Sequence, residues 1–325
     1  MKPLPDISSE INEDKIVKIL AKHFALLGPH IYSLGSNWLI RAYNVYGDID
    51  KYIIAIYLVN RQFIFYRKNN LIVNFNTFFE NKSLEIDKIN ISDISKDLQI
   101  PKESVRRKIQ ELEKKGVIKR VKKKIFVNRT TFSTDRVNIA IKDVSLILFE
   151  FNKILKKEKI TNKVFEIEEI INSIKENYSF CWYQFYKFLF LYTKRWRAVT
   201  NDLETFCIGM VVVINAAKNK KFAPSEAKSF SSYATKIMGS HFRGINAMSI
   251  SEVTGIPRAT VVRKLKWLIE NKFLYINEKK LISLDVTDSS FKKTTDLQKK
   301  NMLSFSNFIY RVFNQIKIID ESNLR

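Results

Sequence analysis

Residues 88–118 read KINISDISKDLQIPKESVRRKIQELEKKGVI, and residues 244–274 read GINAMSISEVTGIPRATVVRKLKWLIENKFL. The two stretches align without a gap at a constant offset of 156 residues, and ten of their 31 positions are identical. The identical pairs are Ile89/Ile245, Asn90/Asn246, Ile94/Ile250, Ser95/Ser251, Ile100/Ile256, Pro101/Pro257, Val105/Val261, Arg107/Arg263, Lys108/Lys264 and Leu112/Leu268. Self-similarity of this kind indicates that the chain carries two copies of one structural unit.

The similarity extends toward the N-terminal side of each stretch. The segment GDIDKYIIAIYLV at residues 47–59 aligns with NDLETFCIGMVVV at residues 201–213, and Trp38 and Trp196 precede these segments at comparable distances. Each repeat is therefore domain-sized, at about a hundred residues. We predict an N-terminal segment and helix at 1–35, a first repeat at 36–135, a helical connector at 136–192, a second repeat at 193–288, and a C-terminal helix and tail at 289–325.

Hydrophobic periodicity predicts the same order of elements in both copies: a long apolar helix, a short extended piece, a short helix, a second helix opened by proline, and a hairpin. In the first copy these elements are expected at 48–65, 89–91, 93–98, 101–115 and 117–128. In the second copy they are expected at 202–218, 245–247, 249–254, 257–271 and 273–284. Helices outside the copies are expected at 143–155, 164–192 and 294–319.

The second helix of each copy carries one pattern, I-P-[KR]-x-[ST]-V-x-R-[KH]-[IL]-x-x-L, as IPKESVRRKIQEL at 100–112 and IPRATVVRKLKWL at 256–268. With the short helix before it and the hairpin after it, each block resembles the winged helix-turn-helix domains of bacterial transcription regulators. The resemblance covers residues 88–128 and 244–284 and identifies no particular regulator family. It implies a mainly α-helical fold with small β-hairpin wings, in which two duplicated winged helix-turn-helix domains are joined by connecting helices. The implied partner is double-stranded DNA.

The spacing of side chains on the second helix separates an anchoring face from a binding face. Val105, Ile109 and Leu112 share one helical face, and their counterparts in the second copy do the same. Arginine suits bidentate contacts with guanine or phosphate, and Lys, Ser and Thr suit phosphate contacts that set the register. The predicted DNA-binding residues are Lys102, Ser104, Arg106, Arg107, Gln110, Lys122, Lys123, Lys124, Arg258, Thr260, Arg263, Lys264, Lys266, Lys279 and Lys280.

The distribution of charge agrees with this interpretation. The chain has 56 basic and 33 acidic residues, a formal net charge of +23 that favours a polyanionic partner. Residues 102–124 hold eleven basic and three acidic residues, and residues 258–280 hold seven basic and two acidic residues. A general lysine bias would spread charge over the chain. Its concentration on the two helices and hairpins therefore points to nucleic acid.

Other classes of function find little support in the sequence. The motifs of P-loop nucleotide binding, dinucleotide binding, zinc proteolysis and serine hydrolysis are absent, so we expect neither an enzyme nor a bound cofactor or metal. The apolar runs at 180–192 and 206–217 are too short to span a bilayer. We expect a cytoplasmic, nucleoid-associated protein. The aromatic run at 180–192 is expected in the core or on a dimer face, and the connector and C-terminal helices are the candidate homodimer surfaces.

Three DNA-binding roles remain open at this level. A transcriptional regulator is favoured because both blocks resemble regulator helices and remain similar to each other. A plasmid- or phage-type replication initiator would share the two winged helices, the basicity and the length. A nucleoid-architectural protein would bind DNA independently of sequence. Winged helices also serve as protein–protein modules, which is a fourth, non-DNA alternative.

Overall fold

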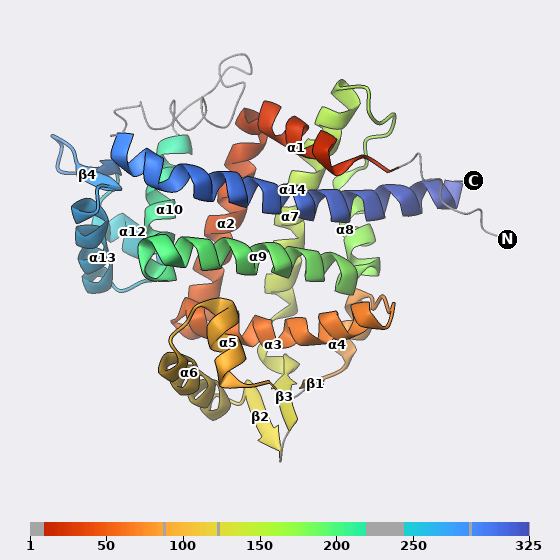
Figure 1. Cartoon of the computed structure of the whole chain (residues 1–325), viewed down its shortest axis with the longest axis horizontal. Coiled ribbons are helices and arrows are strands. Elements are labelled where there is room, and N and C mark those ends of the chain that lie inside the picture. The colour runs from red at the N-terminus through yellow and green to blue at the C-terminus, as the bar shows by residue number, and fades with distance from the viewer. Residues whose placement is uncertain (1–9, 87–88, 122–123, 219–243, 286–287, 325) are drawn as a thin grey trace.

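The computed structural model describes residues 10–86, 89–121, 124–218, 244–285 and 288–324. Over these ranges the chain is mainly helical, with one three-stranded and one two-stranded antiparallel sheet. The expected fold class is therefore confirmed at the level of a mainly α protein with small β-hairpins. Figure 1 shows the elements and their order along the chain.

The first half of the chain runs to residue 157. Its elements are α1 (Glu13–Lys22), α2 (Phe24–Tyr46), α3 (Ile49–Lys68), α4 (Phe75–Glu80), β1 (Ser83–Ile86), α5 (Ile91–Leu98), α6 (Lys102–Lys114), β2 (Ile118–Val121), β3 (Lys124–Asn128), a short 3₁₀ turn (Arg129–Thr131) and α7 (Thr134–Lys157). The strands have the order β1-β3-β2, and β3 pairs antiparallel with both neighbours.

The second half repeats most of this order. Its elements are α8 (Ile167–Glu176), α9 (Tyr178–Thr200), α10 (Leu203–Lys218), α12 (Ala247–Thr254), α13 (Arg258–Glu270), β4 (Leu274–Ile276), β5 (Ile282–Leu284) and α14 (Asp288–Leu324). Strands β4 and β5 form an antiparallel hairpin, and Ile245 makes a single bridge to Ile282 on the side where β1 pairs in the first half.

The correspondence between the halves extends to their first helices. Helices α1 and α8 are each 10 residues long, α2 and α9 are each 23, and both pairs begin 154 residues apart. The turn after α2 is made at Gly47 (φ 67°), and the turn after α9 is made at Asn201 (φ 65°), also 154 residues later. Positive φ is open to glycine and is tolerated by asparagine more readily than by most residues. The two halves thus begin with the same helix, long helix and tight turn.

This correspondence revises the domain organisation expected from the sequence. The expected connector at 136–192 is not a separate element, because α7 closes the first half as α14 closes the second, and α8 and α9 open the second half as α1 and α2 open the first. The expected boundaries at 35/36, 135/136 and 192/193 fall inside α2, α7 and α9. Buried helices keep their packing with many combinations of apolar residues, so their sequences can differ between the halves while the packing is retained.

Each half packs its helices against the other half. Helix α10 packs against α2 and α3 packs against α9, while α1 packs against α14 and α8 against α7. In Figure 1, α9 and α14 run side by side across the molecule, and α2 and α7 cross them. The main hydrophobic core consequently contains buried residues of both halves, from Ile11 to Met210 and from Phe305 to Ile316, whereas part of α10 packs with α12 and α13 in a smaller core. The two halves therefore share the main core.

Two buried asparagines join the halves at equivalent places. On α7, Asn152 accepts a hydrogen bond from the backbone N–H of Phe165 (2.7 Å), just before α8. On α14, Asn314 accepts one from the N–H of Ile11 (3.0 Å) and donates to its carbonyl oxygen (3.0 Å), just before α1. Because buried backbone groups need partners, each asparagine fixes the start of a helix in the opposite half.

The aromatic run of α9 lies in this shared core. Phe185 and Phe188 contact Phe308 of α14, with ring centroids 5.6 Å and 5.9 Å apart, and Phe188 also contacts Phe305 at 5.4 Å. The expectation of a core position for residues 180–192 is thus confirmed. The apolar faces of the two helices that were candidate dimer surfaces pack against each other within one chain.

Several local expectations differ from the structure. The helix expected at 164–192 is divided at Asn177 into α8 and α9. The extended pieces expected at 89–91 and 245–247 are shorter than expected, because Asn90 and Asn246 are extended and Ile245 bridges Ile282, but Ile91 and Ala247 already begin α5 and α12. Strand β1 and helix α4 were not expected, although Leu84 and Ile86 alternate in burial with their neighbours as a strand requires. Among the described residues no single helix could cross a bilayer, and only the pair α9 and α10, bent by 94°, passes on length and composition.

Candidate nucleic-acid interface

The same turn introduces α6 and α13. Pro101 and Pro257 occupy the residue before each helix with φ −53°, and the turn residues before them, Gln99 (φ 53°) and Gly255 (φ 73°), are left-handed. In both turns a serine hydroxyl of the preceding helix donates to the backbone carbonyl before the proline, with Ser95 and Ser251 each at 2.7 Å. Proline fixes φ near the helical value and lacks only an N–H that no helix start needs. Both helices therefore leave the turn in the same way.

The expected anchoring face of each helix is buried. Val105 and Leu112 are fully buried and Ile109 is 6% exposed. Their counterparts Val261, Leu265 and Leu268 have exposed fractions of 0%, 4% and 2%. The first set belongs to the main core and the second set to a smaller core with α10 and α12. The opposite side of each helix is left to solvent.

Most of the predicted DNA-binding residues lie on these solvent-facing sides or on the hairpins. Ser104 and Thr260 are half-buried in the first turns of α6 and α13, and Lys122 and Lys123 lie outside the described residues. The exposed residues are Lys102, Arg106, Arg107, Gln110 and Lys124 in the first half, and Arg258, Arg263, Lys266, Lys279 and Lys280 in the second. In Figure 1, α5 and α6 lie at the bottom of the molecule, and α12 and α13 lie at its left side.

Lys264 was predicted at the binding surface, and this prediction is wrong. Its side chain is 11% exposed, and its ammonium lies 2.7 Å from both carboxylate oxygens of Asp202 and 3.2 Å from the Thr205 hydroxyl. The spacing of the helix contained the signal, because Lys264 lies three residues after Val261 and four before Leu268, on the buried face. Its aliphatic stem packs inside while its charge is neutralised by an internal partner.

Lys108 makes the equivalent contact in the first half. Its ammonium pairs with Asp48, which precedes α3 as Asp202 precedes α10, and lies 3.8 Å from Asp50. Both aspartates also cap their helices, since Asp48 accepts from the Lys51 N–H (3.1 Å) and Asp202 from the Thr205 N–H (2.7 Å). One lysine of each surface helix is thus tied to the start of the core helix beneath it.

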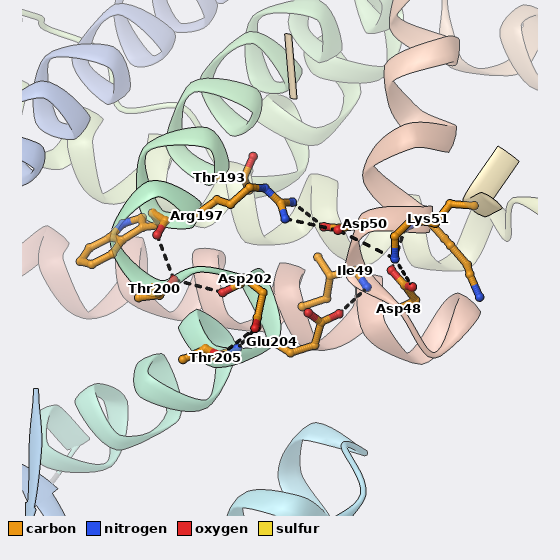
Figure 2. Close-up of polar contacts among 12 residues, drawn as sticks. Asp48, Ile49, Asp50, Lys51, Thr193, Arg197, Thr200, Asp202, Glu204 and Thr205 are labelled. Atoms are coloured by element: carbon orange, nitrogen blue, oxygen red, sulfur yellow. Dashed lines mark hydrogen bonds and ion pairs between the residues drawn. The ribbon is translucent and has the colours of Figure 1, made fainter. Parts of the chain in front are cut away.

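These aspartates belong to a carboxylate cluster where the halves meet. Figure 2 shows Arg197 of α9 reaching Asp50 of α3, and Glu204 of α10 accepting a hydrogen bond from the Ile49 N–H at 3.0 Å. Burial and the nearby charges of Asp50 and Asp48 raise the pKa of Glu204, although the Ile49 hydrogen bond acts in the opposite direction. Burial by itself would also raise the pKa of Asp202, but hydrogen bonds from Lys264 and Thr205 outweigh it and leave that pKa lowered.

Replacing Glu204 with glutamine is expected to stabilise the fold at neutral pH. The amide oxygen can still accept from Ile49, and the substitution removes a charge that burial and two aspartates disfavour. Because the folded-state pKa of Glu204 is raised, its protonation favours the fold, and the advantage of the variant should shrink as pH falls through that pKa. Melting temperatures over a range of pH test this. Glu103→Gln, at an exposed carboxylate, is the control, and an advantage independent of pH would contradict the prediction.

Some of the exposed lysines and arginines on α6 and its hairpin form ion pairs with glutamates. Glu103 lies 3.0 Å from Arg106, and Glu85 of the unexpected strand β1 lies 2.5 Å from Lys124. Arg107 makes a long contact, at 3.9 Å, with Glu111. Within the described part of the chain, no carboxylate lies within 4 Å of the side-chain nitrogens of Lys102, Arg258 or Arg263. These three cations are free to meet an external anion.

Among the described residues no cluster of three or more His, Cys, Asp or Glu side chains could hold a metal ion. Both cysteines are buried in the core, and burial raises the pKa of Cys181 to about 12, so it is a neutral thiol at physiological pH. The surface therefore offers cations, hydroxyls and an amide arranged along two exposed helices.

The two surfaces thus share four features. Each has a turn with a serine-to-carbonyl hydrogen bond, a proline before the helix, three buried apolar anchors and an internal Lys–Asp ion pair. Each presents basic side chains on the side away from its core. No protein-family model matches the chain, and no curated protein and no solved structure matches it either.

Proposed function

We propose that the protein binds double-stranded DNA through two winged helix-turn-helix units and acts as a transcriptional regulator. In this proposal α6 and α13 are the recognition helices, and the hairpins β2–β3 and β4–β5 are the wings. Duplication supplies within one chain the two half-site contacts that many regulators obtain by forming dimers. The bound DNA then meets two related but unequal surfaces.

The observation that carries this proposal is how the lysines and arginines of α6 and α13 divide between core and surface. Lys108 and Lys264, which face inward, are neutralised by Asp48 and Asp202. Most of the remaining cations on the two helices are exposed on the side opposite the anchors. A fold that needed basic residues only for solubility would have no reason to keep them on these helices and hairpins. A major groove accepts an α-helix of this kind, and phosphates supply the anions.

Genome-wide footprinting of the sites bound by the protein in its own cells tests the proposed role. A regulator should occupy scattered promoters. Occupancy of one iterated, origin-like locus would instead indicate a replication initiator, and even coverage would indicate an architectural protein. Absence of DNA binding at low salt would contradict all three roles and leave the protein–protein alternative.

Arg107→Ala and Arg263→Ala are each expected to weaken recognition of one half of the binding site. Each arginine occupies the same position on its helix, and removing a bidentate hydrogen-bonded pair costs about 1–3 kcal/mol, roughly 5- to 150-fold in affinity. The flanking residues differ between the helices, so the preferred site should be an imperfect repeat. Selection of sites from random duplex DNA, with wild type and both variants, measures this.

The matched control for these variants is Lys18→Ala. Lys18 is an exposed cation on α1, which lies at the far end of the molecule from α6 in Figure 1. Its removal should leave the selected sequence unchanged. A strictly palindromic site, or equal weakening at both halves from either arginine variant, would show that the two units do not read one site together.

A further inference from the structure

The exposed faces of α6 and α13 differ in polarity at equivalent positions. At an offset of 156 residues, Glu103 corresponds to Ala259 and Arg106 corresponds to Val262. In α6 the two side chains form an ion pair at 3.0 Å, and they are 75% and 49% exposed. In α13 Ala259 is exposed and Val262 is 50% exposed. A paired acid and base on one helix are thus replaced by two apolar side chains on the other.

Val262 has no structural reason to be apolar. Its neighbour Val261 is fully buried and anchors the helix, whereas Val262 points away from that core. A single exposed valine is common on protein surfaces and carries no argument alone. Here its surroundings matter, because the exposed cations Arg258 and Lys266 lie one turn before and one turn after it, and Arg263 follows it directly. The result is a small apolar spot bordered by positive charge.

Duplex DNA has a matching arrangement of apolar and anionic groups. In the major groove the 5-methyl group of thymine is the apolar feature of the base edges, and alanine and other small apolar side chains contact it. Phosphates border the groove on both sides and attract Lys and Arg. Ala259 and Val262 lie in the first turns of α13, the part of a recognition helix that reaches base edges.

The polar pair on α6 suits different bases. Arginine donates two hydrogen bonds to guanine, and glutamate accepts from the amino group of cytosine. Arg106 and Glu103 therefore carry the donors and acceptors of G·C recognition. Their charged end groups, a guanidinium and a carboxylate, bind through hydrogen bonds and gain nothing from a methyl group.

We propose that α13 recognises thymine through methyl contacts made by Val262 and Ala259, while α6 reads its half-site through hydrogen bonds. This inference rests on the proposed function and names the chemistry by which the two halves of one site are distinguished. The half-site of α13 contains thymines whose methyl groups touch Val262. The half-site of α6 owes little to thymine methyl groups.

Deoxyuridine substitution tests this without altering the protein. Full-length protein is bound to a duplex of its selected site, and the thymines of one half-site at a time are replaced by uracil, which removes only the methyl groups. Arg107→Ala and Arg263→Ala identify which half each helix reads. Substitution in the α13 half should weaken binding about fourfold for each thymine methyl group that α13 covers, the effect of one buried methylene-sized group. Substitution in the α6 half should leave the affinity unchanged.

A protein variant links this effect to one side chain. Val262→Ala should reduce the weakening caused by uracil in the α13 half. Leu303→Ala is the matched control, since Leu303 is also an exposed apolar residue (56%) but lies on α14. It should retain the full sensitivity to uracil. Both residues are exposed, so both variants should keep the wild-type melting temperature.

The outcomes separate the two proposals. Binding to DNA with no effect of uracil in either half, or an equal effect in both, would overturn thymine recognition by α13 and leave DNA binding intact. Disappearance of uracil sensitivity in Leu303→Ala rather than Val262→Ala would also overturn the assignment. If no duplex is bound at low salt, the proposed function fails and this inference fails with it.

Discussion

Lys108→Met is expected to lower the free energy of unfolding by about 3–5 kcal/mol, the usual cost of removing one partner from a buried ion pair. The Lys108 side chain is 10% exposed and that of Asp48 is 20% exposed, and Asp50 and Glu204 lie in the same carboxylate cluster. Without the ammonium, Asp50 still pairs with Arg197, whereas Asp48 loses its buried partner. Urea unfolding of the full chain measures the effect. Lys114→Met, on the exposed side of the same helix, is the control and should change stability little.

A double-mutant cycle shows whether the destabilisation comes from the pair. Asp48→Asn keeps an oxygen to cap α3 and removes only the charge. The double variant Lys108→Met/Asp48→Asn should lose less stability than the sum of the two single variants, because neither charge is left alone. Additive effects would show that the two residues act independently. The equivalent pair in the second half should matter less, since the Asp202 side chain is 39% exposed.

Leu112→Ala and Leu268→Ala are each expected to cost about 2–5 kcal/mol of unfolding free energy, the range for truncating a buried leucine. Leu112 is fully buried and Leu268 is 2% exposed. Each holds its surface helix on the core, so the melting temperature should fall together with DNA affinity. Gln110→Ala, exposed on α6, is the control for stability.

The two leucine variants also test how the cores are divided. Leu112 belongs to the core that both halves share, whereas Leu268 belongs to the smaller core with α10 and α12. We therefore expect Leu112→Ala to lower the stability of the whole chain, and Leu268→Ala to affect the α12–α13 unit first. Hydrogen exchange at α13 and at α9 separates these outcomes. Normal stability with abolished DNA binding in either variant would mean that the helix faces are assigned backwards.

The local structure around α6 and α13 could be predicted because its signals lie close together in the sequence. Proline at the start of each helix and apolar residues at spacings of three and four determine where each helix begins and which face is buried. The repeat at an offset of 156 added support, since two copies with the same spacing rarely arise by chance. Val105, Leu112 and their counterparts were thus placed correctly from the sequence.

Other features could not be read in this way. Strand β1 is four residues long, and its pairing with β3 joins segments about 40 residues apart, as Leu84 with Val127. Lys264 is turned inward by an ion pair with Asp202, which lies 62 positions earlier in the chain. The sequence analysis grouped Lys264 with the predicted DNA-binding residues because it is basic. Its spacing on the helix, however, places it on the same face as the buried anchors. Only the position of Asp202 shows that its charge is neutralised inside.

The sequence by itself determined the duplication, the two surface helices and the side of each that is buried, because these follow from backbone preferences and periodicity within one element. The tertiary structure alone decided that each half is completed by helices of the other, and that Asn152 and Asn314 fix the opposite half at matching points. Helix-to-helix packing accepts many apolar combinations, so the sequences of α1 and α8, or α2 and α9, could diverge while their lengths and partners stayed the same. Burial of a shared apolar surface, which no single segment contains, makes one folded unit of the two copies.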